Sequence, residues 1–196
     1  MPSSTLTTKA RLAVVGLSAA CALAGASGAY AQSGGMPPPG STTPAPAPTA
    51  PTGPVSKAKV TKKGKAIPPA GAPWQVVAAI NAGNQIRKMP YRWGGGHASF
   101  FDSGYDCSGA VSYVLNGAGL IDGPLPSGAL ASSWGTFGKG RWITVYANAG
   151  HTYMVVAGRR FDTSAVGEPV RRGSGPRWRK TKRKPKGYVA KYYPSL

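Results

Sequence analysis

The sequence predicts an α+β domain in which two helices accompany an antiparallel sheet. Three observations lead to this fold class: amphipathic helical patterns over residues 73–89 and 107–118, and β-rich runs over residues 141–150, 151–158 and 160–162. Apolar side chains three or four positions apart mark one face of a helix, whereas short β-rich runs between turn residues favour strands. Because turns connect the β-rich runs, we expect a three-stranded antiparallel meander.

The first predicted helix covers residues 73–89. Pro73 suits the first helical position, where no backbone N–H is needed, and Pro90 ends the helix. An amphipathic helix of this kind buries one apolar stripe. The predicted stripe comprises Trp74, Val77, Ala78, Ala82, Ile86 and Met89.

The second predicted helix begins at Cys107, and Gly117 and Gly119 supply its stop. A thiol in the first turn lies near unpaired N–H groups and the positive end of the macrodipole, which stabilise the reactive thiolate. Cys107 is therefore a candidate nucleophile, although a lone cysteine can also be a small buried hydrophobe. The apolar stripe of this helix comprises Ala110, Val111, Val114, Leu115 and Ala118.

His151 is the better candidate for a catalytic base, because it opens a β-rich run and can face a helix N-terminus. A two-residue turn, at either 157–158 or 158–159, pairs residues whose numbers have an odd sum, so Asp162 shares a sheet face with His151. Ser164 shares that face and is the rival for orienting the imidazole. In the alternative interpretations, Asp162 is a solvated carboxylate at a strand end and His151 only hydrogen-bonds a turn.

His97 lies on a loop shortly before Cys107, where it either lines the site or is an exposed histidine without a role. No metal or other cofactor is expected. The 2 histidines, the one cysteine outside the N-terminal segment and the 5 scattered carboxylates have no spacing typical of zinc or calcium ligands.

Three motifs together resemble a known family, the secreted papain-like cysteine peptidases of the NlpC/P60 type, which cut the stem peptides of bacterial peptidoglycan. The motifs are Pro90-Tyr91-x-Trp93-Gly94-Gly95, then Asp106-Cys107-Ser108-Gly109 at the head of a helix, then His151 at the head of a strand. The resemblance covers residues 73–164 and implies a papain-like fold, in which an antiparallel sheet accompanies a helix that carries the nucleophile at its N-terminus.

The resemblance also implies roles for individual residues. Cys107 would be the nucleophile and His151 the base, while Asp162 lies in the neighbourhood of the third catalytic residue. Tyr91 would lie beside the reacting carbonyl. Asp106 and Ser108, which flank the nucleophile, would help to hold the free amine of the stem peptide. The sequence departs from the family by having an aspartate as third residue and GKGRWITVYANAGH in place of a Pro-Gly-Asp-Leu stretch.

The N-terminal part of the chain has the composition of exported proteins. Residues 1–31 run from a basic start through an apolar stretch to Ala29-Tyr30-Ala31, which predicts a secretory signal cleaved before Gln32. The apolar stretch is too short for a stable membrane span. Lipidation at Cys21 is an alternative. Residues 32–72, rich in Pro, Ala, Thr and Lys, are predicted to be a disordered tether, and residues 73–196 to be the catalytic domain.

The chain is strongly basic, with 24 Lys and Arg against 5 Asp and Glu and a formal net charge of +19. A C-terminal basic block indicates a solvated or polyanion-binding surface. With a secretory signal, we expect anionic wall polymers rather than nucleic acid as its partner. After the block, a final strand near Tyr188 is expected to return to the domain. The block comprises Arg171, Arg172, Arg177, Arg179, Lys180, Lys182, Arg183, Lys184 and Lys186.

These observations predict a secreted, monomeric, wall-associated cysteine endopeptidase that acts on peptidoglycan. Its Cys107, His151 and Asp162 would hydrolyse an amide bond in the stem peptide, and the resemblance implies the bond from D-glutamate to the diamino acid. Two alternatives remain open: a catalytically silent wall-binding protein of the same fold, and an amidase that cuts between sugar and peptide.

Overall fold

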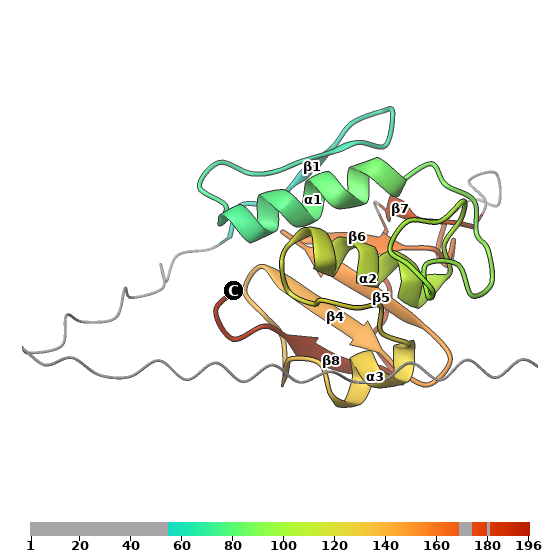
Figure 1. Ribbon diagram of the computed structural model, residues 1–196. Helices are drawn as coiled ribbons and strands as arrows, with labels where there is room; N and C mark the ends of the chain where they lie inside the picture. Colours follow the sequence, from blue (N-terminus) through green and yellow to red (C-terminus); the bar gives the residue numbers. More distant parts are fainter. Residues whose placement is uncertain (1–54, 169–173, 180) are drawn as a thin grey trace, which may run out of the picture. The chain divides into compact units, whose positions relative to one another are not determined.

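The computed structural model describes residues 55–168, 174–179 and 181–196. They form an α+β domain, as the sequence predicts (Figure 1). The elements are, in chain order, β1 (Lys59–Val60), β2 (Ala66–Ile67), α1 (Trp74–Ile86), α2 (Cys107–Gly117), α3 (Ser127–Ser132), β3 (Thr136–Phe137), β4 (Ile143–Ala147), β5 (Thr152–Val156), β6 (Arg159–Asp162), β7 (Arg177–Arg179) and β8 (Val189–Tyr192).

The main sheet has six strands in the order β3-β8-β4-β5-β6-β7, and all neighbours are antiparallel. The predicted meander is its centre, formed by β4, β5 and β6. Val156 pairs with Arg159, so the turn between β5 and β6 is Ala157-Gly158, one of the two predicted positions. Both turn residues have positive φ, 44° and 71°, as a tight two-residue hairpin requires.

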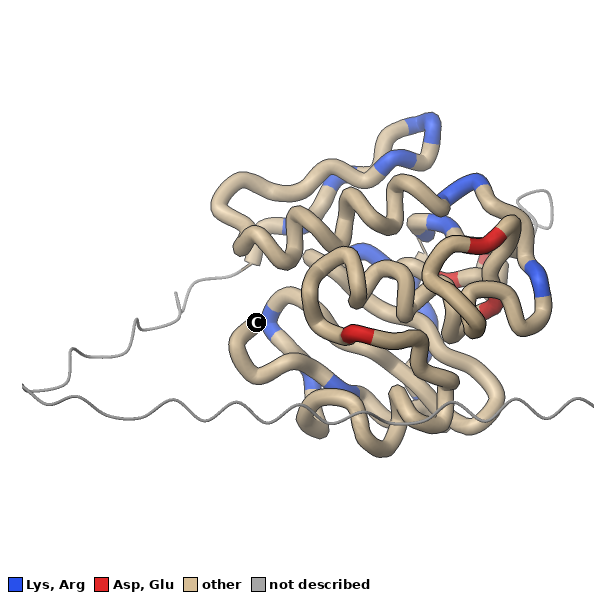
Figure 2. Tube along the Cα trace, viewed as in Figure 1, with Lys and Arg blue, Asp and Glu red and all other residues tan. Residues whose placement is uncertain are grey.

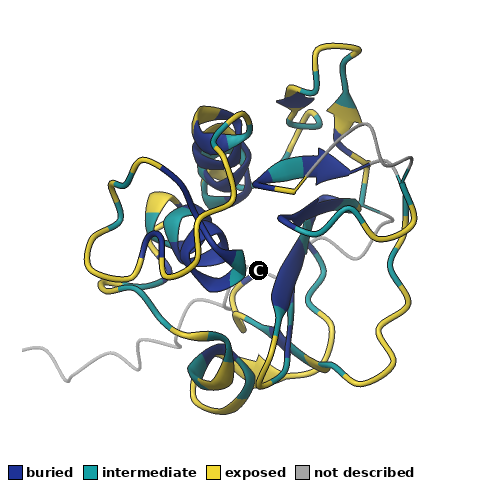
Figure 3. Ribbon diagram, turned by 90° about the vertical axis from the view of Figure 1, so that its right-hand side faces the viewer, coloured by how far each residue is buried: buried dark blue, intermediate teal, exposed yellow. Residues whose placement is uncertain are grey.

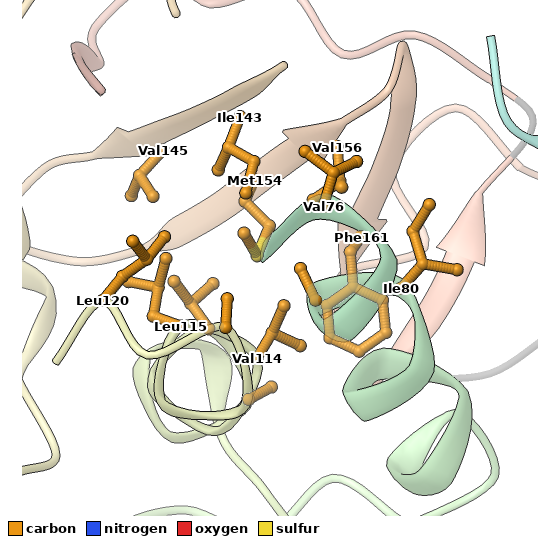
Figure 4. Packing of buried hydrophobic residues seen from close by; sticks show 14 of the residues in the cluster. Val76, Ile80, Val114, Leu115, Leu120, Ile143, Val145, Met154, Val156 and Phe161 are labelled. Carbon is orange, nitrogen blue, oxygen red and sulfur yellow. The ribbon is translucent and has the colours of Figure 1, made fainter. Parts of the chain in front are cut away.

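Helices α1 and α2 pack against each other and cover one side of this sheet (Figure 3). The predicted stripe of α2 is fully confirmed, since all five of its residues are buried. Val114 and Leu115 of α2 meet Met154 of β5 and Phe161 of β6 in the core (Figure 4). Each such side chain contributes roughly 1.5–3 kcal/mol on burial. The core thus fixes the direction of α2 and with it the position of Cys107.

The prediction for α1 was only partly right. Trp74 is 65% exposed, and the buried residues are Val76, Ala79, Ile80, Ala82, Gly83, Asn84 and Ile86. This helix is apolar on most sides, so periodicity alone does not select the face that is buried. Gly83 selects the buried face of α1, because only a residue without a Cβ fits against the ring of Trp178. Pro73 is the N-cap residue rather than the first helical residue.

Residues 55–72 correct the predicted domain boundary. They form the β1–β2 hairpin, with Ala58 and Ala66 fully buried, instead of a tether. The side-chain amide of Asn84 in α1 donates to the Ala66 carbonyl at 2.8 Å and accepts from the Ala66 N–H at 2.9 Å. Composition typical of a linker did not reveal this backbone pairing. The rest of the predicted tether and the predicted signal, residues 1–54, lie outside the described residues.

The C-terminal segment returns to the sheet as predicted, with β8 between β3 and β4. The basic block that precedes it is not uniformly solvated, which corrects the prediction. Arg179 is buried and pairs with Glu168 at 2.8 Å, and Arg177 donates to the Arg87 carbonyl at 2.8 Å. Arg171, Arg172 and Lys180 lie outside the described residues. Figure 2 shows Lys and Arg spread over the hairpin, helix ends and strands of the domain.

The described residues lack two kinds of feature, a membrane-spanning helix and a metal-binding cluster. Within residues 55–168, 174–179 and 181–196, none of the helices has the length and apolarity needed to cross a membrane. The same part of the chain has no group of three or more His, Cys, Asp or Glu side chains arranged to hold a metal ion.

Candidate active site

Cys107 is the first residue of α2, and Asp106 caps the helix. The Asp106 carboxylate accepts a hydrogen bond from the Gly109 N–H at 2.8 Å. As in any α-helix, the other N–H groups of the first turn have no acceptors inside the helix, and the half-buried Cys107 belongs to this turn. The helix end thus supplies a nucleophile and the hydrogen-bond donors that an oxyanion needs.

A glycine-rich loop, residues 94–96, fixes the start of α2. The Gly95 carbonyl accepts from the Asp106 N–H at 3.2 Å, and the Gly94 N–H donates to the Asp106 carboxylate at 3.2 Å. A Cβ at Gly109 would overlap the Gly95 carbonyl oxygen. The glycines therefore allow two backbone segments to touch beside Cys107.

His151 directly precedes β5, where the Asn148 side chain accepts its backbone N–H at 2.8 Å. Its Nε2 lies 3.0 Å from Oδ1 of Asp162, which ends β6. Met154 pairs with Phe161, and in this register the side chains of His151 and Asp162 lie on the same face of the sheet, as the alternation along the strands predicts. Since Nε2 faces the carboxylate, Nδ1 is the nitrogen left for Cys107, with which the ring is hydrogen-bonded.

The electrostatics of this pair favour charge separation. Burial opposes ionisation of Cys107, but hydrogen bonds from the His151 ring and the Thr152 backbone N–H outweigh it and lower the pKa of the thiol. Burial also opposes protonation of His151, yet its hydrogen bonds with Asp162 and Cys107 raise its pKa to about 9. Each member of the pair therefore favours the charged form of the other, the thiolate of Cys107 and the imidazolium of His151.

Asp162 is buried, with 2% of its surface exposed, and several donors surround it. The Ser164 N–H donates to Oδ1 at 2.8 Å, Arg183 Nη1 donates to Oδ2 at 3.2 Å, and Arg160 Nε lies 3.6 Å from Oδ2. Of the two residues that the sequence offered as orienting groups, Asp162 contacts the imidazole. Ser164 contributes its backbone N–H to that aspartate.

Arg183 is the site residue that sequence reasoning missed. Besides its bond to Asp162, its Nη1 lies 3.5 Å from Nε2 of His151. Its guanidinium lies over the rings of Tyr153 and Tyr188, at 5.4 and 5.3 Å from their centroids, and donates to the Tyr188 hydroxyl at 2.6 Å. No local signal distinguishes it from the neighbouring basic residues, because its contacts depend on the return of the chain to the sheet.

A second cluster flanks the nucleophile on its other side. His97 Nε2 lies 2.9 Å from an Asp106 oxygen and 3.0 Å from the Ser108 hydroxyl, so His97 is part of the site's surroundings rather than a free loop residue. Asp106 is buried and already holds the cap and the loop. Burial and the nearby Cys107 and Asp106 raise the pKa of Tyr91, whose backbone is bridged to Tyr105 just before the helix cap.

No protein-family model matches the sequence, and no curated protein matches it either. Solved structures do. A hypothetical invasion protein of Mycobacterium tuberculosis is 24% identical with a TM-score of 0.42, over 61% of this chain and 64% of that one. An NlpC/P60 family protein from Bacillus cereus is 19% identical with a TM-score of 0.44, over 66% of this chain and 42% of that one.

The peptidoglycan hydrolase RipB from Mycobacterium tuberculosis is also similar, at 22% identity and a TM-score of 0.44 over 64% of this chain and 68% of that one. An NlpC/P60 protein is thus among the similar structures. These identities and TM-scores are low, so the chemistry of this chain has to be inferred from its own residues.

Proposed function

We propose that this chain is a cysteine hydrolase that cleaves an amide bond in peptidoglycan stem peptides. The observation that carries the proposal is the linked set of Cys107, His151 and Asp162. The thiol lies at a helix N-terminus and is hydrogen-bonded to an imidazole, which in turn lies 3.0 Å from a buried carboxylate. These are the groups that amide hydrolysis requires: a nucleophile, a proton carrier and a group that orients it.

In the proposed mechanism the Cys107 thiolate attacks the amide carbonyl, and the N–H groups at the start of α2 stabilise the oxyanion. The C–N bond breaks as the His151 imidazolium gives its proton to the leaving amine, which leaves a thioester on Cys107. The neutral imidazole then takes a proton from water, which attacks the thioester. The C–S bond then breaks, which releases the carboxylic acid and restores the Cys107 thiolate beside the imidazolium that formed when His151 took the proton of water. Asp162 keeps the ring oriented throughout and stabilises the imidazolium.

The proposed substrate follows from the motif resemblance and from the groups beside the thiol. Asp106, Ser108 and His97 form a polar cluster next to Cys107 that supports binding of the free amine of a stem peptide. The proposal assigns Tyr91 to contact with the reacting carbonyl, as the motif resemblance implies. The bond from D-glutamate to the diamino acid is the one we propose to be cut.

Secretion is part of the same proposal. A peptidoglycan substrate lies outside the cytoplasmic membrane, and the signal-like residues 1–31 support export to the cell wall. Sequencing the N-terminus of the exported protein tests this directly. A mature chain that begins at Gln32 is the expected result, and an intact N-terminus on a cell-bound protein would contradict it.

The proposal is tested by incubating the chain with purified peptidoglycan and identifying the released fragments by mass spectrometry. A new free amine on the diamino acid is the expected product, and Cys107→Ser should release none. Release of whole stem peptides from the sugar would identify an amidase instead. Binding to the wall without any fragment would favour the catalytically silent alternative.

A further inference from the structure

The sheet face opposite the helices holds a cavity that borders the candidate active site at Arg183 but has no assigned role in the proposed catalysis. Side chains on β4, β5 and β6 alternate, so Met154, Val156 and Phe161 face the helices while their neighbours face the other way. Those neighbours line a cavity of about 380 Å³. A volume in this range is typical of small-molecule sites. Cys107 and His151 are not among the residues that line it.

The lining of this cavity is strongly cationic. Six basic side chains and no carboxylate are found among its described lining residues. All three arginines are paired with acids outside the cavity wall, Arg179 with Glu168, and Arg160 and Arg183 with Asp162. The three lysines are exposed and form no ion pair within the described part of the chain. The six are Lys57, Lys139, Arg160, Arg179, Lys182 and Arg183.

Arg160 contributes a second, independent observation. Only 3% of its surface is exposed. Its Nη2 donates to the Val166 carbonyl at 3.1 Å and to the Thr181 hydroxyl at 3.3 Å, but its Nη1 has no hydrogen-bond partner among the described residues. Arg160 forms an ion pair with Asp162, whose Oδ2 lies 3.6 Å from its Nε, but a buried N–H donor at Nη1 without an acceptor is still unfavourable. Because Arg160 lines the cavity, an anion bound there would supply the missing acceptor.

Two stacked tyrosines give the cavity an aromatic wall. The rings of Tyr146 and Tyr153 lie 4.9 Å apart with an interplanar angle of 12°. Tyr153 is buried, whereas Tyr146 is half-buried and borders the cavity. An aromatic face of this kind accommodates the flat or apolar side of an organic group.

We propose that this cavity binds a phosphate ester, with the phosphate held by Arg160 and the surrounding lysines and the organic part against Tyr146. A phosphate carries more charge than a carboxylate and offers more acceptor oxygens, which fits several cations that surround one buried guanidinium. The ester is either a phosphorylated small molecule or one repeat of a phosphodiester polymer. The cavity shares Arg160 and Arg183 with the surroundings of Asp162, but the proposal of phosphate binding does not depend on the proposed hydrolase activity.

The site is tested by isothermal titration of the full chain with inorganic phosphate and with N-acetylglucosamine 1-phosphate. The triple variant Lys57→Gln, Lys139→Gln, Lys182→Gln should raise both Kd values by about tenfold or more, because it removes three cations that line the cavity. The matched control, Lys62→Gln, Lys65→Gln, Lys184→Gln, removes the same charge from exposed lysines that do not line it. The control should bind like the unmodified chain.

A further variant separates the two halves of the site. Tyr146→Leu should weaken binding of the sugar phosphate while leaving the Kd for inorganic phosphate unchanged. Titration with poly(glycerol phosphate) then distinguishes the sources: a repeat unit that binds more tightly than the sugar phosphate identifies the polymer, and the reverse identifies the small molecule. Absence of saturable phosphate binding, or equal loss in the pocket and control variants, would overturn the proposal.

The test is also separable from the hydrolase. Cys107→Ser should abolish peptidoglycan cleavage and leave phosphate binding unchanged, because Cys107 does not line the cavity. If cleavage were absent in the unmodified chain, saturable phosphate binding that depends on Lys57, Lys139 and Lys182 would still support the site.

Discussion

Cys107 and His151 titrate as a pair rather than as two separate groups, because each hydrogen-bonds the other. The lowered pKa of the thiol and the raised pKa of the imidazole, about 9, open a pH window in which both are charged. Below this window the thiolate is protonated and cannot attack. Above about pH 9 the imidazole lacks the proton that the leaving amine needs.

The first prediction concerns the reactivity of Cys107 with iodoacetamide as a function of pH. The thiol should be alkylated at neutral pH faster than a free cysteine, because its lowered pKa increases the fraction of thiolate. In His151→Ala the midpoint of the alkylation profile should move upward, since burial remains while the stabilising partner is lost. The same profile in both proteins would contradict the ion pair. Mass spectrometry of the labelled peptide gives the readout.

The second prediction separates Asp162 from Ser164. Asp162→Asn should lower kcat by roughly 10²-fold and leave partial activity, because an amide still accepts from the imidazole but no longer stabilises its charge. Ser164→Ala should change kcat little, since Ser164 reaches Asp162 through its backbone N–H. A larger loss for Ser164→Ala than for Asp162→Asn would show that the orienting residue is wrongly assigned. Steady-state kinetics on a soluble stem peptide measures both.

For individual residues, the sequence predicted that His151 and Asp162 can contact each other, but it did not predict the residues that surround them. The alternation of side chains along a strand was enough to place His151 and Asp162 on one face. The contact between Arg183 and Asp162 joins residues 21 positions apart through the return of the chain. No local pattern encodes such a contact. Asp106 was expected only to bind substrate, and its role as helix cap emerged from the hydrogen bonds of its carboxylate.

At the scale of elements, the nucleophile helix α2 was the most predictable part of the fold. It has one apolar stripe and a polar start, so its buried face follows from periodicity alone. In α1 apolar residues occur on most sides, and packing against Trp178 selected a different stripe from the predicted one. The β1–β2 hairpin escaped prediction because its strands are two residues each and its anchor, Asn84, lies in α1.

The third prediction tests the contact between the glycine-rich loop and α2. Gly109→Ala should destabilise the domain by about 1–3 kcal/mol, because the added methyl group overlaps the Gly95 carbonyl and the backbones have to separate. Activity should fall further than stability alone explains, since Cys107 lies two residues away. Urea unfolding at equilibrium measures the first effect and peptide turnover the second.

Gly128→Ala is the matched control for that change. Gly128 lies in α3, and no atom would come within 4 Å of an added Cβ. Alanine in a helix is more favourable than glycine by roughly 0.5–1 kcal/mol, so this variant should be as stable as the unmodified chain or slightly more so. Equal destabilisation by the two substitutions would contradict the proposed close contact.

At the scale of the whole molecule, the basic residues behind the net charge of +19 have at least three separate roles. Arg177 and Arg179 tie β7 to neighbouring loops, and Arg183 contacts Asp162. The exposed lysines remain available for long-range attraction to anionic wall polymers. A count of basic residues along the sequence cannot separate these roles, because burial depends on how β7 and β8 return to the sheet.

The last prediction follows from this division. Replacement of five exposed lysines by Gln should weaken retention on intact cell walls, because attraction between exposed charges and a polyanion carries the binding. The unmodified chain should lose retention steeply as salt is added, since the screening length falls from ~8 Å at physiological ionic strength to ~3 Å at 1 M. The variant should show a flatter salt dependence. The five are Lys62, Lys63, Lys65, Lys184 and Lys186.

Two comparisons make that result specific. Replacement of the same five lysines by Arg keeps the charge, so retention and its salt dependence should be preserved. Turnover of a small soluble stem peptide should be unchanged in both variants, because none of the five lysines contacts Cys107, His151 or Asp162 among the hydrogen bonds and ion pairs of the described residues. Arg179→Gln should instead unfold the domain, because it leaves the Glu168 carboxylate buried without its ion-pair partner. If the variant with five lysines replaced by Gln bound walls as tightly and with the same salt dependence as the unmodified chain, wall affinity would have to come from the candidate active site or from the phosphate-binding cavity.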